Sequence, residues 1–344
     1  MRKFTFWLFN CVFLALMSCN PTATDQVDTE AEQRKKDSLE RIREAEEKEK
    51  ARARTAEDIL LDKELTYDEH TLEDEYAYED TTRYFQFDKI KDHLAQVENF
   101  QREQIRYAVI QNRQNKNREA PLVENFVRND YKRVSDTLGT ERYQSAPLYP
   151  TENSEKPTIY GRDGWLVGLE SSDTLDMVKI RGISFDGTWF IPKRYLKTIG
   201  DTMDIRFISM VDVTNQNICT VEKVAQYEWK IRSMNPATTG QHKPPHAMET
   251  PTGLFVVQEQ KPKMYYHGDG TTTIEGFAPH ASRFTNGAYI HGVPVNNPKG
   301  SIIEYSWSLG TTPRSHMCVR NASSHAKFVY EQSKPMESLV IVLD

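Results

Sequence analysis

The C-terminal half of the chain constrains the fold most, because from Asp204 onward one short strand-like segment follows another. Segments 205–213 and 216–224 are rich in apolar and β-branched residues, and Thr214-Asn215 separates them as a turn. Similar segments follow at 227–233, 253–257, 264–267 and 288–292, one helix is expected at 322–332, and an apolar run at 339–343 ends the chain. The pattern predicts a mainly β fold, with an antiparallel β domain over residues 204–344.

A second, smaller β unit is expected before it. Segments 165–169 and 177–181 alternate as strands do, and Asp186-Gly187 marks a hairpin turn. The hairpin with Gly187-Thr188-Trp189, followed by an Ile-Pro-x-x-Tyr-Leu ending at 191–196, resembles bacterial SH3-like domains, which are small barrels often attached to cell-wall enzymes. We therefore expect an SH3-like domain at 155–200. The alternative is an extra hairpin on the domain that follows.

The N-terminus has the features of a secretory signal. Arg2 and Lys3 precede an apolar stretch at 4–17, which is too short to span a bilayer and has the length of a signal-peptide core. The run 16–19, Leu-Met-Ser-Cys, resembles the bacterial lipobox, in which the signal is cut before a cysteine that then carries lipid. This predicts a lipoprotein signal at 1–18 and a lipid anchor on Cys19. Asn20 favours the outer membrane, facing the periplasm; the alternative is a plain secretory signal with a chance cysteine.

The region between signal and β domains is expected to be extended and helical. Residues 24–60 are dense in Glu, Lys, Arg and Ala with few apolar positions, which predicts a solvated helix or a disordered spacer rather than a coiled coil. We interpret 19–80 as a tether whose acidic end, 61–80, is loop. Residues 84–111 have helical apolar spacing, a short helix is expected at 126–138, and 146–157 carries three prolines. Residues 81–150 are therefore interpreted as a helical segment and linker.

Charge and motifs exclude several classes of function. The chain has 44 Lys and Arg against 50 Asp and Glu, a net charge of -6, without a basic block. This argues against a nucleic-acid partner. No nucleotide loop, dinucleotide fingerprint, haem motif or zinc motif is present. His242 and His246 stand four apart, but Pro244-Pro245 prevents a helix from placing both on one face. We expect no cofactor and no metal.

Two cysteines remain beyond Cys19, and they lie in different settings. A periplasmic protein could pair Cys219 with Cys318 as a disulfide. Alternatively, Cys219 is a buried inert thiol, because it alternates with its neighbours in a predicted strand. Cys318 lies in a turn ahead of a predicted helix, where free N–H groups and the helix dipole lower a thiol pKa. Two histidines, His291 and His316, are within reach of it as candidate bases.

Three separated motifs carry a resemblance to a known family. They are Ile290-His291-Gly292 with the run 315–321, Ser-His-Met-Cys-Val-Arg-Asn; Thr238-Thr239-Gly240; and the run 249–255, Glu-Thr-Pro-Thr-Gly-Leu-Phe. Residues 204–332 thereby resemble the L,D-transpeptidase (YkuD-like) catalytic domain. The resemblance implies an enzyme that cross-links peptidoglycan stem peptides. Its cysteine attacks the carbonyl after the L-centre of a diamino acid, expels the terminal D-alanine and passes the acyl group to an amine. It also implies that a carbapenem can acylate the cysteine.

Position by position, the resemblance implies a role for each motif residue. Cys318 would be the nucleophile, His291 the base of a thiolate–imidazolium pair, and Gly292 the carbonyl that holds the imidazole. His316 would orient rather than act as base, although sequence alone does not separate the two histidines. The backbone N–H groups of 316–318 would form the oxyanion hole. The residues expected to brace the loop or contact the substrate, besides these amides, are Ser315, Met317, Arg320 and Asn321.

Two departures from the family pattern bear on activity. Met317 stands where the family has Gly, which costs energy if the backbone there has positive φ. The interval from His291 to Cys318 is longer than usual and carries an insertion at 294–307, interpreted as a lid or substrate-facing loop, or as a plain surface excursion. The functional alternatives are therefore a catalytically silent wall-binding lipoprotein and an L,D-carboxypeptidase that uses water as acceptor.

Overall fold

The computed structural model describes residues 23–102 and 106–344, so the signal sequence and Cys19 lie outside the described residues. The chain divides into two compact units, 1–53 and 54–344. The described part of the first unit is the charged helix α1 (Ala23–Ala51), which confirms the helical interpretation of the spacer there. Its sparse apolar residues Leu39 and Ile42 are exposed. No helix among the described residues is both long enough and apolar enough to cross a membrane.

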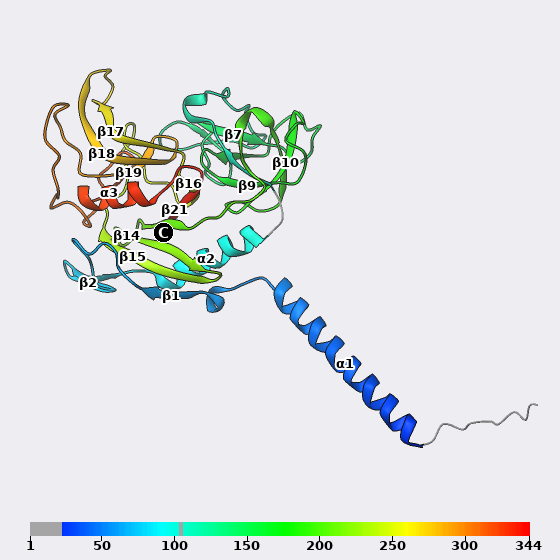
Figure 1. The fold of residues 1–344 in the computed structure, drawn as a ribbon. Coiled ribbons are helices and arrows are strands. Elements are labelled where there is room, and N and C mark those ends of the chain that lie inside the picture. Colours follow the sequence, from blue (N-terminus) through cyan, green and yellow to red (C-terminus); the bar gives the residue numbers. More distant parts are fainter. Residues whose placement is uncertain (1–22, 103–105) are drawn as a thin grey trace, which may run out of the picture. The chain divides into compact units, whose positions relative to one another are not determined.

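A six-stranded sheet is the centre of the second unit (Figure 1), with strand order β1-β15-β14-β13-β21-β16. Its strands are β1 (Leu60–Lys63), β13 (Phe207–Asp212), β14 (Asn217–Ala225), β15 (Glu228–Pro236), β16 (Gly253–Val256) and β21 (Ser338–Leu343). The apolar β21 is buried along its whole length between β13 and β16. This confirms the mainly β prediction. The sheet is not purely antiparallel, because β21 pairs with β13, and β1 with β15, in parallel.

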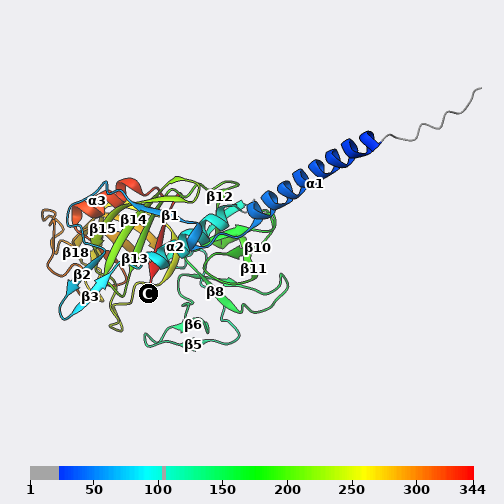
Figure 2. The same cartoon turned by 90° about the horizontal axis from the view of Figure 1, so that it is seen from below.

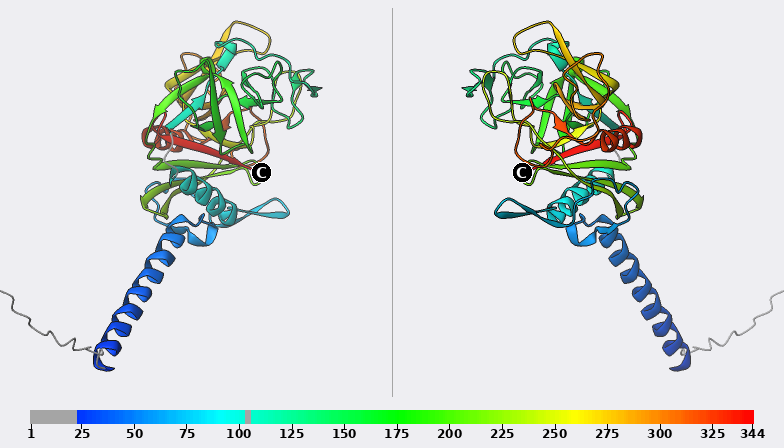
Figure 3. Two further views of the ribbon diagram at one scale, coloured as in Figure 1. Left: turned by 90° about the vertical axis from the view of Figure 1, so that its right-hand side faces the viewer. Right: turned by 90° about the vertical axis from the view of Figure 1, so that its left-hand side faces the viewer.

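Each face of this sheet covers its own hydrophobic core. One core joins the sheet to α2 (Phe87–Arg102) through Ile90, Leu94 and Val97 of the helix. The other joins it to Val329 of α3 (Ser323–Gln332) and to a four-stranded sheet of order β17-β18-β19-β20. The strands of that sheet are β17 (Glu259–His267), β18 (Ile274–Thr285), β19 (Ala288–His291) and β20 (Val319–Arg320). Figure 3 shows α2 on one side of the green strands and the red α3 on the other.

A third sheet has five strands, in the order β11-β10-β9-β4-β12. Its strands are β4 (Arg106–Ile110), β9 (Leu166–Leu169), β10 (Met177–Gly182), β11 (Thr188–Pro192) and β12 (Leu196–Gly200). Of the helix expected at 84–111, the structure contains α2, which ends at Arg102. Residues 107–110 are apolar on both faces and form a fully buried strand between β9 and β12. The SH3-like interpretation of this sheet stays a prediction.

The expected helix at 126–138 is wrong. Two short paired strands, β5 (Val127–Arg128) and β6 (Val134–Ser135), lie there instead. The buried carboxylate of Asp136 accepts hydrogen bonds from the backbone N–H groups of Leu138, Thr140 and Tyr160, and so fixes a turn. The predicted linker at 146–157 is also wrong at its start, because the buried strand β7 (Ser145–Leu148) pairs with β8 (Ile159–Arg162).

The acidic segment expected to end the tether as loop is part of the folded unit. Besides β1 it forms the hairpin β2 (Glu75–Tyr78) and β3 (Thr81–Tyr84), visible in Figure 2 beside α2. Ile59 and Phe85 are buried in the same core as α2. In α2 the buried Glu98 accepts hydrogen bonds from Lys223 Nζ at 2.8 Å and Trp229 Nε1 at 3.0 Å. Residues 56–102 therefore belong to the core on which the site is built.

Candidate active site

The parallel strands β19 and β20 bring the two halves of the predicted site together. In their register Ile290 pairs with Val319 and His291 with Arg320, so Cys318, just before β20, lies two residues before the partner of His291. Cys318 and His291 line one cavity of about 680 Å³. Ser315, His316 and Arg320 line the same cavity. Gly292, Met317 and Asn321 do not.

His291 is held in one tautomer by its own neighbour. Its Nδ1 lies 2.6 Å from the carbonyl oxygen of Gly292, and a carbonyl only accepts, so Nδ1 carries the hydrogen. Nε2 is then the basic nitrogen of the neutral ring. Burial lowers the pKa of His291 to about 4, which keeps the ring neutral near pH 7. Only glycine fits at 292, because a Cβ there would lie 2.6 Å from Ser323 Oγ.

Cys318 is 8% exposed, and its Sγ donates to the carbonyl oxygen of Gly287 at 3.6 Å. Burial raises the pKa of Cys318 more than the backbone of Tyr289 and the charge of Arg320 lower it. The thiolate–imidazolium pair that the resemblance implies stays a prediction. The helix expected to follow Cys318 is α3, and it begins at Ser323.

The two described cysteines do not form the alternative disulfide. Cys219 and Cys318 are both free. Cys219 is 1% exposed in β14, and burial raises the pKa of its thiol far above the usual range. This agrees with the interpretation of Cys219 as an inert core thiol.

The turn before Cys318 leaves its backbone amides available. Ser315 Oγ donates to the carbonyl of Cys318 across the turn, and Ser315 N–H bonds to Thr239 O at 3.0 Å. Within 23–102 and 106–344, the backbone N–H groups of residues 316–318 have no hydrogen-bond partner. Met317 has φ of +81°, the left-handed conformation in which glycine is least strained. The turn thus has the geometry expected of the family's glycine, but with a methionine in it.

The two upstream motifs hold this turn in place. The backbone of Thr238 pairs with that of Arg320 through two hydrogen bonds of 2.9 Å. The hydroxyl of Thr250 accepts the N–H of Gly240 at 2.8 Å and donates to the carbonyl of Met317 at 2.9 Å. A Cβ at Gly240 would lie 2.2 Å from Met248 O and 2.8 Å from Met317 Cα, so the close approach requires glycine.

The remaining predicted residues take different positions. Arg320 lines the cavity, and its buried Nε has no hydrogen-bond partner among the described residues. Burial lowers its pKa. Asn321 is fully buried and its Nδ2 contacts Pro236 O at 3.4 Å, so it braces the loop and does not face the cavity. His316 is exposed, with Nδ1 3.5 Å from Asp269 Oδ1. The buried, oriented His291 is therefore the better base.

Part of the cavity wall has no counterpart in the sequence analysis. Tyr266, Asp269 and Glu275 reach the cavity from the hairpin of β17 and β18. No motif marks them, and only their position near a Gly-rich turn at 268–270 could have drawn attention. The insertion at 294–307 does border the cavity, through Pro294, Asn296 and Ser306.

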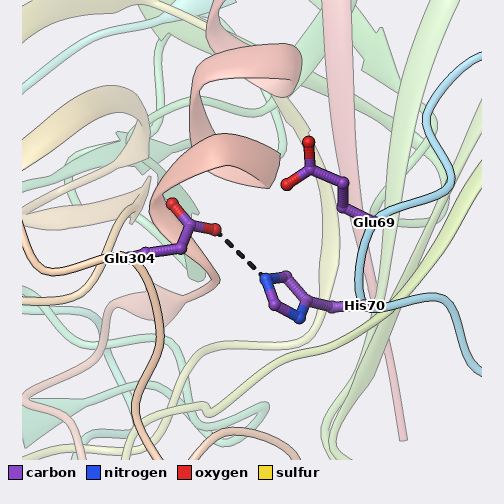
Figure 4. A group of neighbouring side chains, drawn as sticks. All are labelled: Glu69, His70 and Glu304. Atoms are coloured by element: carbon purple, nitrogen blue, oxygen red, sulfur yellow. Dashed lines mark hydrogen bonds and ion pairs between the residues drawn. The ribbon is translucent and has the colours of Figure 1, made fainter.

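The insertion is also joined to the start of α3. Ser323 Oγ donates to Ile303 O at 2.7 Å, and the N–H of Ser324 donates to Glu304 Oε2 at 3.0 Å. One group in the described part of the chain could hold a metal ion: Glu69, His70 and Glu304, whose ligand atoms lie within 4.8 Å of one another. Figure 4 shows His70 directed at Glu304, at 3.2 Å. All three are exposed and none lines the cavity, so the group has no part in the site.

Comparisons with known proteins match the part of the chain that contains these residues. Residues 206–342 match the family model described as the L,D-transpeptidase catalytic domain, YkuD. The comparison with curated proteins finds no match.

Several solved structures are similar to parts of the chain. A fused zinc-dependent amidase/peptidase/peptidoglycan-binding domain protein from Clostridium acetobutylicum is 18% identical, with a TM-score of 0.29; the match covers 40% of this chain and only 51% of that one. An L,D-transpeptidase from Mycobacterium smegmatis is 17% identical over 52% of this chain and 82% of that one, with a TM-score of 0.34. One from Mycobacterium tuberculosis is 16% identical over 58% and 98%, with a TM-score of 0.32.

Proposed function

We propose that the chain is a cysteine-dependent peptidoglycan L,D-transpeptidase, with Cys318 as nucleophile and His291 as base. The observation that carries the proposal is the pairing of β19 with β20. It places Cys318 and His291 on one cavity and leaves Nε2 as the only basic nitrogen of an imidazole whose Nδ1–H is bonded to Gly292. The segment that matches the L,D-transpeptidase family model contains all of these residues.

In the proposed mechanism the Cys318 thiol and the His291 imidazole are both neutral before the attack. As the Cys318 sulfur attacks the stem-peptide carbonyl, its proton passes to Nε2 of His291, so the thiolate forms only during attack. The negative charge on the carbonyl oxygen faces the unpaired amides of residues 316–318. His291 then gives the proton to the leaving amine of the terminal D-alanine, and a thioester remains on Cys318. An acceptor amine attacks the thioester and transfers its proton to His291, which returns it to the departing Cys318 thiolate.

Arg320 supplies the recognition of charge in the same cavity. Its Nε is buried and has no partner among the described residues, and such a donor is stabilised when a ligand oxygen reaches it. A carboxylate of the stem peptide is the matching group. Tyr266 and Asn296, whose side chains bond at 2.6 Å, close the neighbouring wall of the cavity.

The envelope location belongs to the same proposal. A lipid on Cys19 would anchor the chain, in our interpretation at the outer membrane facing the periplasm. The helix α1, with 29 residues, would span roughly 44 Å at 1.5 Å per residue and act as the spacer. The five-stranded sheet, interpreted as SH3-like, would assist in binding the wall.

Intact-mass spectrometry of the full chain after incubation with imipenem tests the nucleophile. We expect one covalent adduct on the wild type, none on Cys318→Ala, and much slower formation on His291→Gln. An adduct that persists on Cys318→Ala would refute the assignment. A folded wild type that stays unmodified, yet sediments with peptidoglycan, would favour the silent wall-binding alternative.

A second assay separates the two enzymatic alternatives. A stem tetrapeptide with a diamino acid at its third position is incubated with the chain, and products are separated by mass. Cross-linked dimer supports transpeptidation. Release of D-alanine without dimer, even with excess acceptor amine, would make water the acceptor and the chain an L,D-carboxypeptidase.

A further inference from the structure

A second cavity lies in the folded unit, remote in sequence from the catalytic motif. It has about 530 Å³ and is lined from α2, β8, the segment leading into β9, the hairpin of β10 and β11, and β16. None of its lining residues lines the cavity of Cys318. Its volume is in the range of small-ligand pockets, about 300–1,000 Å³.

An indole N–H in its wall has no partner. Trp165 is 8% exposed, and its buried Nε1 makes no hydrogen bond within the described residues. Next to this nitrogen lies the bare Cα of Gly253, where a Cβ would be 3.7 Å from Nε1. A buried N–H without an acceptor is unfavourable, and such groups in native proteins usually meet a ligand or water. The indole therefore offers one donor to an occupant.

A cation in the same wall is also unpaired. The guanidinium of Arg162 has no hydrogen bond or ion pair among the described residues, and burial lowers its pKa. Asp136 and Glu141 are the carboxylates that act on it, but both are engaged elsewhere. Asp136 accepts three backbone N–H groups, and Glu141 bonds Asn129 and Arg133.

The other lining groups limit what kind of anion fits. Asp186 has no ion-pair partner in the described part of the chain and is exposed at the rim, and His93 is the remaining ionisable group. Burial lowers the pKa of His93, so it is neutral near pH 7. The cavity lining therefore carries one permanent positive charge, on Arg162, and one carboxylate, on Asp186. These two charges complement a zwitterionic ligand better than a phosphate dianion. Trp165 and Phe185, with ring centroids 5.5 Å apart, supply an apolar wall between them.

We propose that this cavity is a second ligand site, which binds a short peptide with free termini. The peptide carboxylate lies on Arg162 and the indole N–H of Trp165, its ammonium on Asp186, and its small apolar side chains against Phe185. The inference does not depend on Cys318 chemistry. It adds a peptide-binding site to the chain whether or not the chain turns over wall peptides.

Nuclear magnetic resonance of the full chain, with ¹⁵N-labelled tryptophan and trialanine as probe, tests the proposal. The Trp165 indole signal is identified from its loss in Trp165→Phe. We expect trialanine to shift this signal, and the C-terminal amide of trialanine to bind at least about tenfold more weakly. No shift at about 10 mM trialanine, or equal binding of the acid and the amide, would overturn the proposal.

Variants locate the contacts. Arg162→Gln should weaken trialanine binding about tenfold or more, while imipenem acylation of Cys318 stays unchanged. Because Arg162 is partly buried, the exposed Asp186→Asn provides an independent test. It should weaken trialanine but leave N-acetyl-trialanine unaffected, and the exposed Glu155→Gln is the matched control. Unchanged binding to a folded Arg162→Gln protein, or a Trp165 shift that disappears when Cys318 is acylated, would place the peptide elsewhere.

Discussion

The hydroxyl of Thr250 donates to the carbonyl of Met317 at 2.9 Å and accepts the N–H of Gly240 at 2.8 Å. One side chain thus holds the carbonyl of Met317 in the turn that precedes Cys318. Thr250 is 4% exposed, so water does not replace it easily. The motif 249–255 acts here as a support for the turn at 315–318 rather than as a source of reacting groups.

Thr250→Val removes this hydroxyl and keeps the shape. We expect imipenem acylation of Cys318 to slow about tenfold to hundredfold, because the oxyanion donors shift from their positions. The free energy of unfolding should fall by about 1 kcal/mol. Stopped-flow acylation and thermal melts measure the two effects. Thr250→Ser, which keeps the hydroxyl, is the control, and a Val variant as fast as the Ser variant would contradict the role.

Met317 provides a second test, because its φ of +81° is a conformation that costs non-glycine residues about 1–2 kcal/mol. In most positions glycine is less stable than alanine. Here we expect the reverse: Met317→Gly should be more stable than Met317→Ala by about 1 kcal/mol, and should retain acylation. Chemical denaturation of both variants decides the point. If Met317→Ala were the more stable of the two variants, the turn would have to relax away from the positive φ seen at Met317.

At acidic pH, the rate of acylation by imipenem should follow the protonation of His291. Its folded pKa of about 4 lies below the ordinary histidine value, so the ring stays a base until the pH falls through about 4. We therefore expect the imipenem rate to persist well below pH 6 and to fall near pH 4. A fall near pH 6.5 would mean that His291 is not the base or is solvated.

Stability has to be measured alongside this rate. Burial lowers the pKa of His291 to about 4 and that of His325 to about 3. The unfolded chain therefore takes up protons first, and stability present above about pH 6.5 is lost as the pH falls toward these values. Far-ultraviolet circular dichroism at each pH separates unfolding from the loss of the base. His246→Gln, at an exposed site outside the cavity, should leave both profiles unchanged.

The motifs led to residues that line one cavity, whereas the local patterns misplaced several helices and strands. Cys318 and His291 meet on one cavity because paired strands carry both motifs, and strand periodicity in 204–344 is strong. The sequence could not show that burial raises the pKa of Cys318, since burial depends on distant elements. It could not show the place of β4 either. An apolar run such as 107–110 fits a helix end or a buried strand equally well, and only pairing with β9 and β12 decides.

The same tertiary pairing leads to a prediction about truncation. A fragment of residues 150–344 keeps every catalytic motif but loses β1, α2 and β4, and with them the buried Ile59, Leu94 and Val109. It also leaves Trp229 and Lys223 without the carboxylate of Glu98. We expect this fragment to aggregate or melt without a cooperative transition, whereas residues 54–344 should fold like the full chain and react with imipenem. Thermal melts and intact mass of the two fragments, prepared in parallel, compare them. If the 150–344 fragment melts cooperatively and reacts with imipenem, residues 54–149 are not needed for the catalytic domain to fold.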